Sequence, residues 1–114
     1  MAADRRRFPR MALPGTVYVH DGQSMHAVTL VDIGLGGVAV LGEPKFRLGA
    51  AVRLVVKSGW LEIPLQARGI VVRTDYSQPA FAIQFTVTSV LFEAVLYRAA
   101  KAHGEPSWKW VAAS

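Results

Sequence analysis

The sequence has no cysteine, which excludes disulfides, thiolate zinc sites and cysteine nucleophiles. It also lacks any apolar run near the roughly 18 residues that a membrane-spanning helix needs. Charged residues are scarce at 18%, whereas hydrophobic residues make up 52% of the 114 positions. This balance predicts one folded domain with a single core and no transmembrane segment. No apolar signal core follows the basic N-terminus, so we expect a cytoplasmic protein.

Residue patterns that support catalysis or metal binding are missing as well. The three histidines, His20, His26 and His103, do not have the spacing of metal ligands. The glutamates are scattered without a clear acid/base pair, and no serine lies in the glycine-flanked turn of a hydrolase nucleophile. We therefore expect no enzyme activity, no metal and no cofactor.

What the sequence does have is a concentration of arginine at its start. The first ten residues include Arg5, Arg6, Arg7 and Arg10. Set against the single Asp4, they supply a net +3 of the chain's total of +5, and the sequence pI is about 10.1. Guanidinium groups bind phosphates in a bidentate manner and stack on bases, which predicts an anionic ligand. Pro9 favours an extended arm over a helix, although a solvated basic tail is the alternative.

The body of the sequence is typical of an all-β domain. Short segments rich in β-branched residues are separated by Gly, Pro, Asp or Ser. The expected strands are Leu13–His20, Met25–Ile33, Gly37–Leu41, Ala51–Lys57, Leu61–Arg73 and Ala80–Phe85. Six strands at this spacing predict a small antiparallel barrel or sandwich. Pro64 and Gly69 indicate that the fifth segment is bent, bulged or at an edge.

The periodicity then changes to that of a helix over Thr86–Ala102, with Thr88 or Ser89 as N-cap and His103-Gly104 as its stop. We expect this helix to pack on the sheet through Val90, Leu91, Ala94 and either Val95 or Leu96. Trp60 is expected to pack against the core. The tail, residues 104–114, has no predicted structure, and Trp108 and Trp110 could contact a partner, a membrane surface or the body.

A second motif, Asp32-Ile33-Gly34-Leu35-Gly36-Gly37, lies between two predicted strands. Glycines allow positive φ and close approach of the backbone to other groups. The motif could also be an ordinary glycine-rich hairpin turn in which Asp32 bonds its own backbone. It is not a dinucleotide-binding fingerprint, because the glycine spacing differs and no helix follows.

Together the two motifs resemble the PilZ domain, a bacterial receptor for the second messenger cyclic di-GMP. That family carries RxxxR, here Arg6 to Arg10, followed by [DN]xSxxG, here Asp32 to Gly37. The resemblance extends from Arg5 to about Ala100. It implies a six-stranded antiparallel β-barrel with a C-terminal helix, with residues 1–12 as a flexible basic arm and 13–103 as the barrel and helix.

The resemblance also implies a ligand and roles for the motif residues. Arg6 and Arg10 would hold the phosphates and stack on the guanines, Asp32 would accept hydrogen bonds from a guanine edge, and Gly37 would allow close approach. Arg5 would favour a stacked pair of ligand molecules. Gly34 departs from the family pattern because it replaces the serine. We expect that loss to weaken binding by up to about tenfold.

The leading hypothesis is therefore a non-enzymatic cyclic di-GMP sensor that signals to a downstream effector protein. One alternative is a PilZ-like adaptor that no longer binds the nucleotide, with Gly34 as its support. A second is a small barrel that binds RNA or single-stranded DNA. Such binding usually needs a stripe of exposed aromatic residues among Lys and Arg along the strands. No such stripe is evident in the sequence, so we expect no DNA partner. The regulated process, the oligomeric state and whether the chain is a domain of a longer protein stay open.

Overall fold

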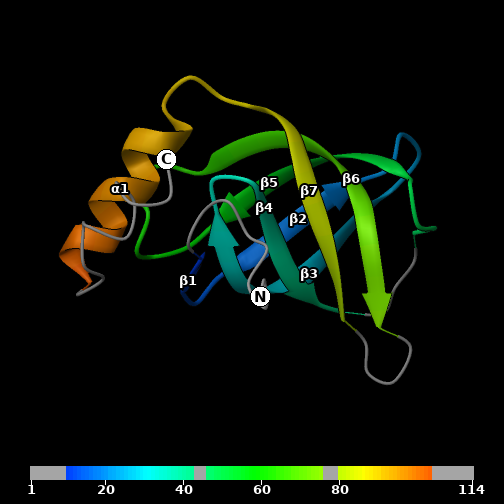
Figure 1. Cartoon of the computed structure of the whole chain (residues 1–114), viewed down its shortest axis with the longest axis horizontal. Helices are drawn as coiled ribbons and strands as arrows, with labels where there is room; N and C mark the ends of the chain where they lie inside the picture. Colours follow the sequence, from blue (N-terminus) through cyan, green and yellow to red (C-terminus); the bar gives the residue numbers. More distant parts are fainter. Residues whose placement is uncertain (1–9, 43–45, 76–79, 104–114) are drawn as a thin grey trace, which may run out of the picture.

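The computed structural model describes residues 10–42, 46–75 and 80–103, with seven strands and one helix (Figure 1). The elements are β1 (Arg10–Ala12), β2 (Thr16–His20), β3 (Met25–Gly34), β4 (Gly37–Leu41), β5 (Ala51–Lys57), β6 (Leu65–Asp75), β7 (Ala80–Thr88) and α1 (Phe92–Ala102). All the strand pairs are antiparallel. The side chains of residues 73–75 lie outside the description.

The sheet closes on itself into a barrel. The strands follow the order β1-β3-β2-β5-β6-β7-β4, and an additional pairing of β3 with β4 joins the two ends. The closed ring therefore consists of six strands, β2 to β7, and β1 pairs with the last residues of β3. This confirms the predicted six-stranded antiparallel barrel with a C-terminal helix. Closure leaves the ring without exposed sheet edges.

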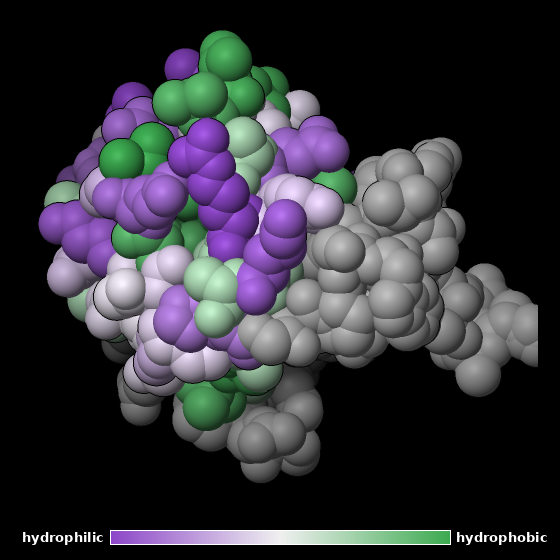
Figure 2. All heavy atoms as spheres, turned by 90° about the vertical axis from the view of Figure 1, so that its left-hand side faces the viewer, coloured by the Kyte–Doolittle hydropathy of each residue, from purple (hydrophilic) through white to green (hydrophobic). Residues whose placement is uncertain are grey.

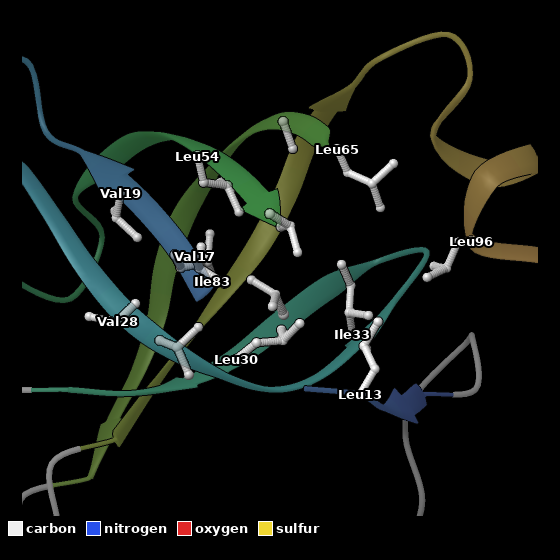
Figure 3. Close-up of a cluster of buried hydrophobic side chains, with 14 of the residues drawn as sticks. Leu13, Val17, Val19, Val28, Leu30, Ile33, Leu54, Leu65, Ile83 and Leu96 are labelled. Carbon is white, nitrogen blue, oxygen red and sulfur yellow. The ribbon is translucent and has the colours of Figure 1, made fainter. Parts of the chain in front are cut away.

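Alternating apolar residues fill the barrel. In β5, Val52, Leu54 and Val56 point inward and are at most 4% exposed, whereas their neighbours face outward. The same two-residue period applies to β2 through Val17 and Val19. Figure 3 shows such side chains from several strands converging on one cluster. Among the described residues no polar or charged residue is buried, so the hydrophobic effect accounts for this core.

The structure refines the boundaries of several predicted strands. Arg10–Ala12, which the sequence assigned to the arm, forms β1. The fifth predicted strand begins at Leu65, after Pro64, and not at Leu61. Its expected irregularity at Gly69 is present as a shift of the β6–β7 register between Arg68 and Gly69. A Cβ at Gly69 would lie 2.5 Å from the Gln84 carbonyl oxygen, so the close strand contact requires glycine.

The helix begins later than predicted and uses a different face. Residues 86–88 extend β7, and α1 starts at Phe92 with Leu91 as N-cap and no side-chain cap. The expected contacts through Val90, Leu91 and Ala94 were wrong. Val90 is 99% exposed, and Leu91 and Ala94 are exposed as well. The buried face of the helix consists of Phe92, Val95, Leu96, Ala99 and Ala100.

This buried face has the i, i+3, i+4, i+7, i+8 spacing of an amphipathic helix that starts at Phe92. The Phe92 ring packs edge-to-face on Phe85 of β7, with centroids 5.1 Å apart. At the other end of the helix, His103 stacks on Trp60 at 4.0 Å. Trp60 thus packs against the core as expected, and α1 covers one end of the hydrophobic cluster, where Leu96 lies in Figure 3.

Leu96→Ala should therefore destabilise the domain by about 2–5 kcal/mol, because Leu96 is fully buried and its loss leaves a cavity. Val90→Ala is the matched control and should change stability by less than about 0.5 kcal/mol, since Val90 is almost entirely in solvent. Urea denaturation of both variants measures the difference. Equal losses of stability in the two variants would contradict the assignment of Leu96 to the buried face of α1 and of Val90 to the solvent.

Candidate ligand-binding site

The pairing of β1 with β3 places Arg10, the last residue of the first motif, beside the second motif. Arg10 lies directly opposite Gly34 in the antiparallel register, and Met11 lies opposite Ile33. Met11 and Ile33 are both fully buried, which fixes this pairing to the core. Because successive strand residues face opposite sides, Arg10 points away from the core, on the same face as position 34. The last arginine of the arm therefore lies on the glycine-rich motif.

A bulge in β3 turns Asp32 outward. The β3–β4 register shifts between Leu30 and Asp32, which leaves Val31 as an extra residue. Leu30 and Ile33 are buried, whereas Val31 is exposed and Asp32 is half-buried. Under strict alternation with Leu30, Asp32 would face the apolar interior, where an ionised carboxylate is very costly. The bulge thus places this carboxylate on the outer surface of the barrel.

Arg10 and Asp32 form an ion pair across the two strands. The Arg10 Nη1 group donates to Asp32 Oδ1 at 3.0 Å, and the two side chains are 22% and 26% exposed. This bond uses one donor nitrogen of the guanidinium, which has five N–H groups, and one of the two carboxylate oxygens. Toward the described residues, the pair therefore has further donors and an acceptor at the surface.

Gly37 provides space beside this pair. A Cβ at position 37 would lie 2.6 Å from the Ile83 carbonyl oxygen of β7 and 3.4 Å from Arg10 Nη2. Real Cβ atoms do not approach a backbone oxygen so closely, so β4 and β7 can pair here only around glycine. The preceding residue, Gly36, accepts a backbone hydrogen bond from Phe85 at 2.9 Å. The motif is thus tied to β7.

The structure brings together Arg10, Asp32, Gly34 and Gly37, four of the six site residues predicted from the sequence. The other two, Arg5 and Arg6, lie outside the described residues, as do Trp108 and Trp110. Positive φ occurs in the described chain at Gly22 and Gly49, and the close approach at Gly37 needs none. Asp32 bonds Arg10, in contrast to the alternative in which it would bond its own backbone.

Two contributions to the site were missed by the sequence analysis. One is β7, whose Ile83 and Gln84 lie against Gly37 although they are far away along the chain. No local signal identifies such a neighbour. The other is the bulge, for which a signal existed: apolar residues follow every second position at Val28 and Leu30 and then skip to Ile33. A spacing of three inside a strand indicates an extra residue.

Two of the histidines lie at the turn between β2 and β3. His20 Nδ1 accepts a hydrogen bond from the Gly22 N–H at 2.9 Å, and His26 contacts the Ser24 hydroxyl at 3.1 Å, both at the β2–β3 turn. Within residues 10–42, 46–75 and 80–103, no group of three or more His, Asp or Glu side chains could hold a metal ion. In the same part of the chain, no helix has the length and hydrophobicity needed to cross a membrane.

Comparison with known families gives a match to the PilZ domain over residues 4–99, which includes both motifs. The chain belongs to the PilZ domain family. PilZ domains are ligand-binding modules for cyclic di-GMP, so membership supports a receptor or adaptor role in signalling by this nucleotide. No curated protein sequence matches the chain.

Solved structures with the PilZ fold superpose on the barrel. The inhibitor of motility MotI/DgrA of Bacillus subtilis aligns with a TM-score of 0.71 at 18% identity, over 87% of this chain. The chain spans about half, 51%, of that protein. The PilZ domain of YcgR from Escherichia coli, solved with c-di-GMP, aligns with a TM-score of 0.62 at 15% identity, over 90% of this chain and 100% of that one. At these low sequence identities, the structural similarity shows a shared fold alone.

Gly37→Ala should destabilise the domain by about 1–3 kcal/mol, because its methyl group would collide with the Ile83 carbonyl and force β4 from β7. Gly59→Ala is the control, since a Cβ there meets nothing within 4 Å. It should stay within about 0.5 kcal/mol of the parent protein. Chemical denaturation compares the two, and a neutral Gly37→Ala variant would contradict the described packing.

Proposed function

We propose that this PilZ domain is a non-enzymatic cyclic di-GMP sensor that transmits nucleotide binding to an effector protein. In this proposal Arg5, Arg6 and Arg10 contact the phosphates and guanines, and Asp32 accepts a hydrogen bond from a guanine edge. The observation that carries the proposal is the register of β1 on β3, which holds Arg10 on Asp32 and opposite Gly34. Arg10, the last residue of the RxxxR motif, thus shares one surface with the DxGxxG motif.

The chemistry of this surface suits a cyclic dinucleotide. The ligand offers two phosphates and two purine faces, and a guanidinium can serve either. Among the described residues, Arg10 uses one donor nitrogen and Asp32 one oxygen in their mutual bond, so the other donors and the second oxygen could contact a ligand. Stacking contributes roughly 1–3 kcal/mol per base, which would add to the hydrogen bonds that the arginines make with the phosphates.

Ligand binding is proposed to fix the arm over the Asp32 turn and so to alter the surface presented to the effector. Under this mechanism amide exchange in residues 5–8 slows when cyclic di-GMP is saturating. Arg5 would decide whether one molecule or a stacked pair is held, which the stoichiometry of titration reports for the parent chain and for Arg5→Ala.

Isothermal titration with cyclic di-GMP tests the proposal through Arg10. Arg10→Ala should weaken binding by about 10- to 100-fold, because it removes charged hydrogen bonds and a stacking surface. Arg10→Lys keeps the charge but not the planar fork, so it should lie closer to Arg10→Ala than to the parent. Arg47→Ala removes an exposed arginine elsewhere and is the control. No heat from the parent protein at high micromolar ligand in low salt would contradict the proposal.

Gly34→Ser restores the hydroxyl that the family motif carries, on the face that Arg10 covers. It should strengthen binding by up to about tenfold, the worth of one hydrogen bond. Its effect should be smaller than that of Arg6→Ala or Arg10→Ala. A gain that exceeds the loss in the arginine variants would show that the turn, and not the arm, dominates recognition.

The second candidate function is an adaptor that binds its effector without the nucleotide. Gly34 favours it, as does the ion pair that already satisfies part of Arg10 in the absence of ligand. The retention of Arg10, Asp32 and Gly37 on one surface favours the sensor. Effector capture that is unchanged by cyclic di-GMP, together with no calorimetric signal, would establish the adaptor.

A further inference from the structure

The barrel wall that lies across from Arg10 and Asp32 carries a row of basic side chains. Arg53 of β5 lies directly opposite Arg68 of β6, and His20 of β2 lies opposite Arg53 on the other side. Both arginines are exposed and point outward, since their neighbours along each strand face the core. Three adjacent strands thus present nitrogen donors in one line across the sheet.

This row conflicts with the usual rules of strand pairing. Like charges directly opposite one another on neighbouring strands destabilise a sheet. Within residues 10–42, 46–75 and 80–103, neither arginine has a salt bridge to compensate. Asp32 and Glu62 pair with other arginines. An arrangement of like charges that costs stability and has no acidic partner among the described residues points to a binding role.

The nearest acid by sequence, Asp21, forms no salt bridge with Arg53 or Arg68 among the described residues. Its carboxylate accepts hydrogen bonds from the Gln23 and Ser24 backbone N–H groups, each at 2.9 Å. These bonds lower the pKa of Asp21. His20 Nδ1 is likewise engaged by the Gly22 N–H, so its Nε2 is the nitrogen left to contact a ligand.

The row lies in a surface groove of about 550 Å³ that also has apolar walls. Val87 lies opposite Arg68 and is 58% exposed, and Met25 is 62% exposed on the other rim. In the β7–α1 connection, which follows the lining residue Ser89 along the chain, Val90 and Leu91 are exposed as well. In Figure 2 the top of the molecule is hydrophobic, at the height where Figure 1 shows this connection. The groove therefore combines cationic and hydrophobic contacts.

The groove does not offer the stacking surfaces that nucleic acid needs. Tyr18 is the one aromatic residue along its described lining besides His20, and the Lys57 ammonium lies 5.4 Å from the centre of the Tyr18 ring. Bases bind through successive exposed aromatic faces, whereas carboxylates need only the guanidinium donors. Charge and apolar rim together fit an acidic protein segment with interspersed hydrophobic residues.

We propose that the groove over β2, β5 and β6 is a docking site for an acidic, partly hydrophobic segment of a partner protein. The paired guanidinium groups of Arg53 and Arg68 bind its carboxylates, and Val87 and Met25 contact its apolar side chains. In the barrel order β3-β2-β5-β6-β7-β4, strands β5 and β6 lie across the ring from β4 and β3. The partner segment and a ligand at Arg10 can therefore bind to the domain at the same time. The proposed docking site does not depend on whether the domain binds cyclic di-GMP.

The test uses a fluorescein-labelled peptide of about ten residues in which glutamate and leucine alternate, with the full chain at low salt. Arg53→Glu should weaken its binding by about tenfold or more, measured by fluorescence anisotropy, because the groove loses its charge. The same change places a carboxylate opposite Arg68 and should raise, not lower, the melting temperature. A variant that melts at a higher temperature but binds the peptide more weakly would show that Arg53 acts in docking and not in stabilising the fold.

Arg47→Glu makes the same change in net charge outside the groove and is the matched control. It should leave peptide binding nearly unchanged, as should saturating cyclic di-GMP. The inference is overturned if Arg47→Glu and Arg53→Glu weaken binding equally, or if the peptide does not bind the parent chain. It is also overturned if an oligothymidine of similar length binds more tightly and depends on Arg53.

Discussion

Strand β3 is the element on which both the barrel and its candidate site depend. It pairs with β2 through its first half and with β4 through its second, and the β3–β4 pairing closes the ring. The bulge at Val31 then changes the phase of the strand, so that Ile33 completes the core while Asp32 faces outward. Without that extra residue the carboxylate would be buried in an apolar interior.

Strand β1 pairs with the last residues of β3, beyond the part of β3 that pairs with β2. Met11 opposite Ile33 anchors the three-residue strand in the core, and this places Arg10 on the outer surface beside Asp32. The burial of Met11 and Ile33 thus determines where Arg10 lies, because the partly exposed ion pair with Asp32 would by itself contribute little to stability. Packing also requires glycine at position 37, because a side chain there would collide with β7 and lie close to the Arg10 guanidinium.

The two walls of the barrel carry different chemistry. Around β1, β3 and β4 the charges are paired, glycines are tightly packed and one arginine is held in place. Across the ring, Arg53 and Arg68 are exposed beside apolar side chains. In the proposed sensor, one wall would bind the ligand and the opposite wall would bind the effector.

Much of this could be predicted from sequence where local patterns are strong. The alternation in Ala51–Lys57 predicted a strand with the bounds that the structure shows, and the two motifs were correctly expected to belong to one family fold. The helix face was wrong because Val90 and Leu91 fit the apolar period but precede the first turn at Phe92. The contact of Gly37 with Ile83 could not be predicted, since it joins strands through tertiary pairing alone.

The central claim is that cyclic di-GMP binds where Arg10 lies on the DxGxxG motif. A titration of the ¹⁵N-labelled chain with the nucleotide, followed by backbone amide NMR, tests it most directly. The account predicts saturable shifts at Arg10, Asp32, Gly34 and Gly37, with the amides of Arg53 and Arg68 unchanged. Shifts confined to the β5–β6 wall, or none at saturating nucleotide, would contradict it.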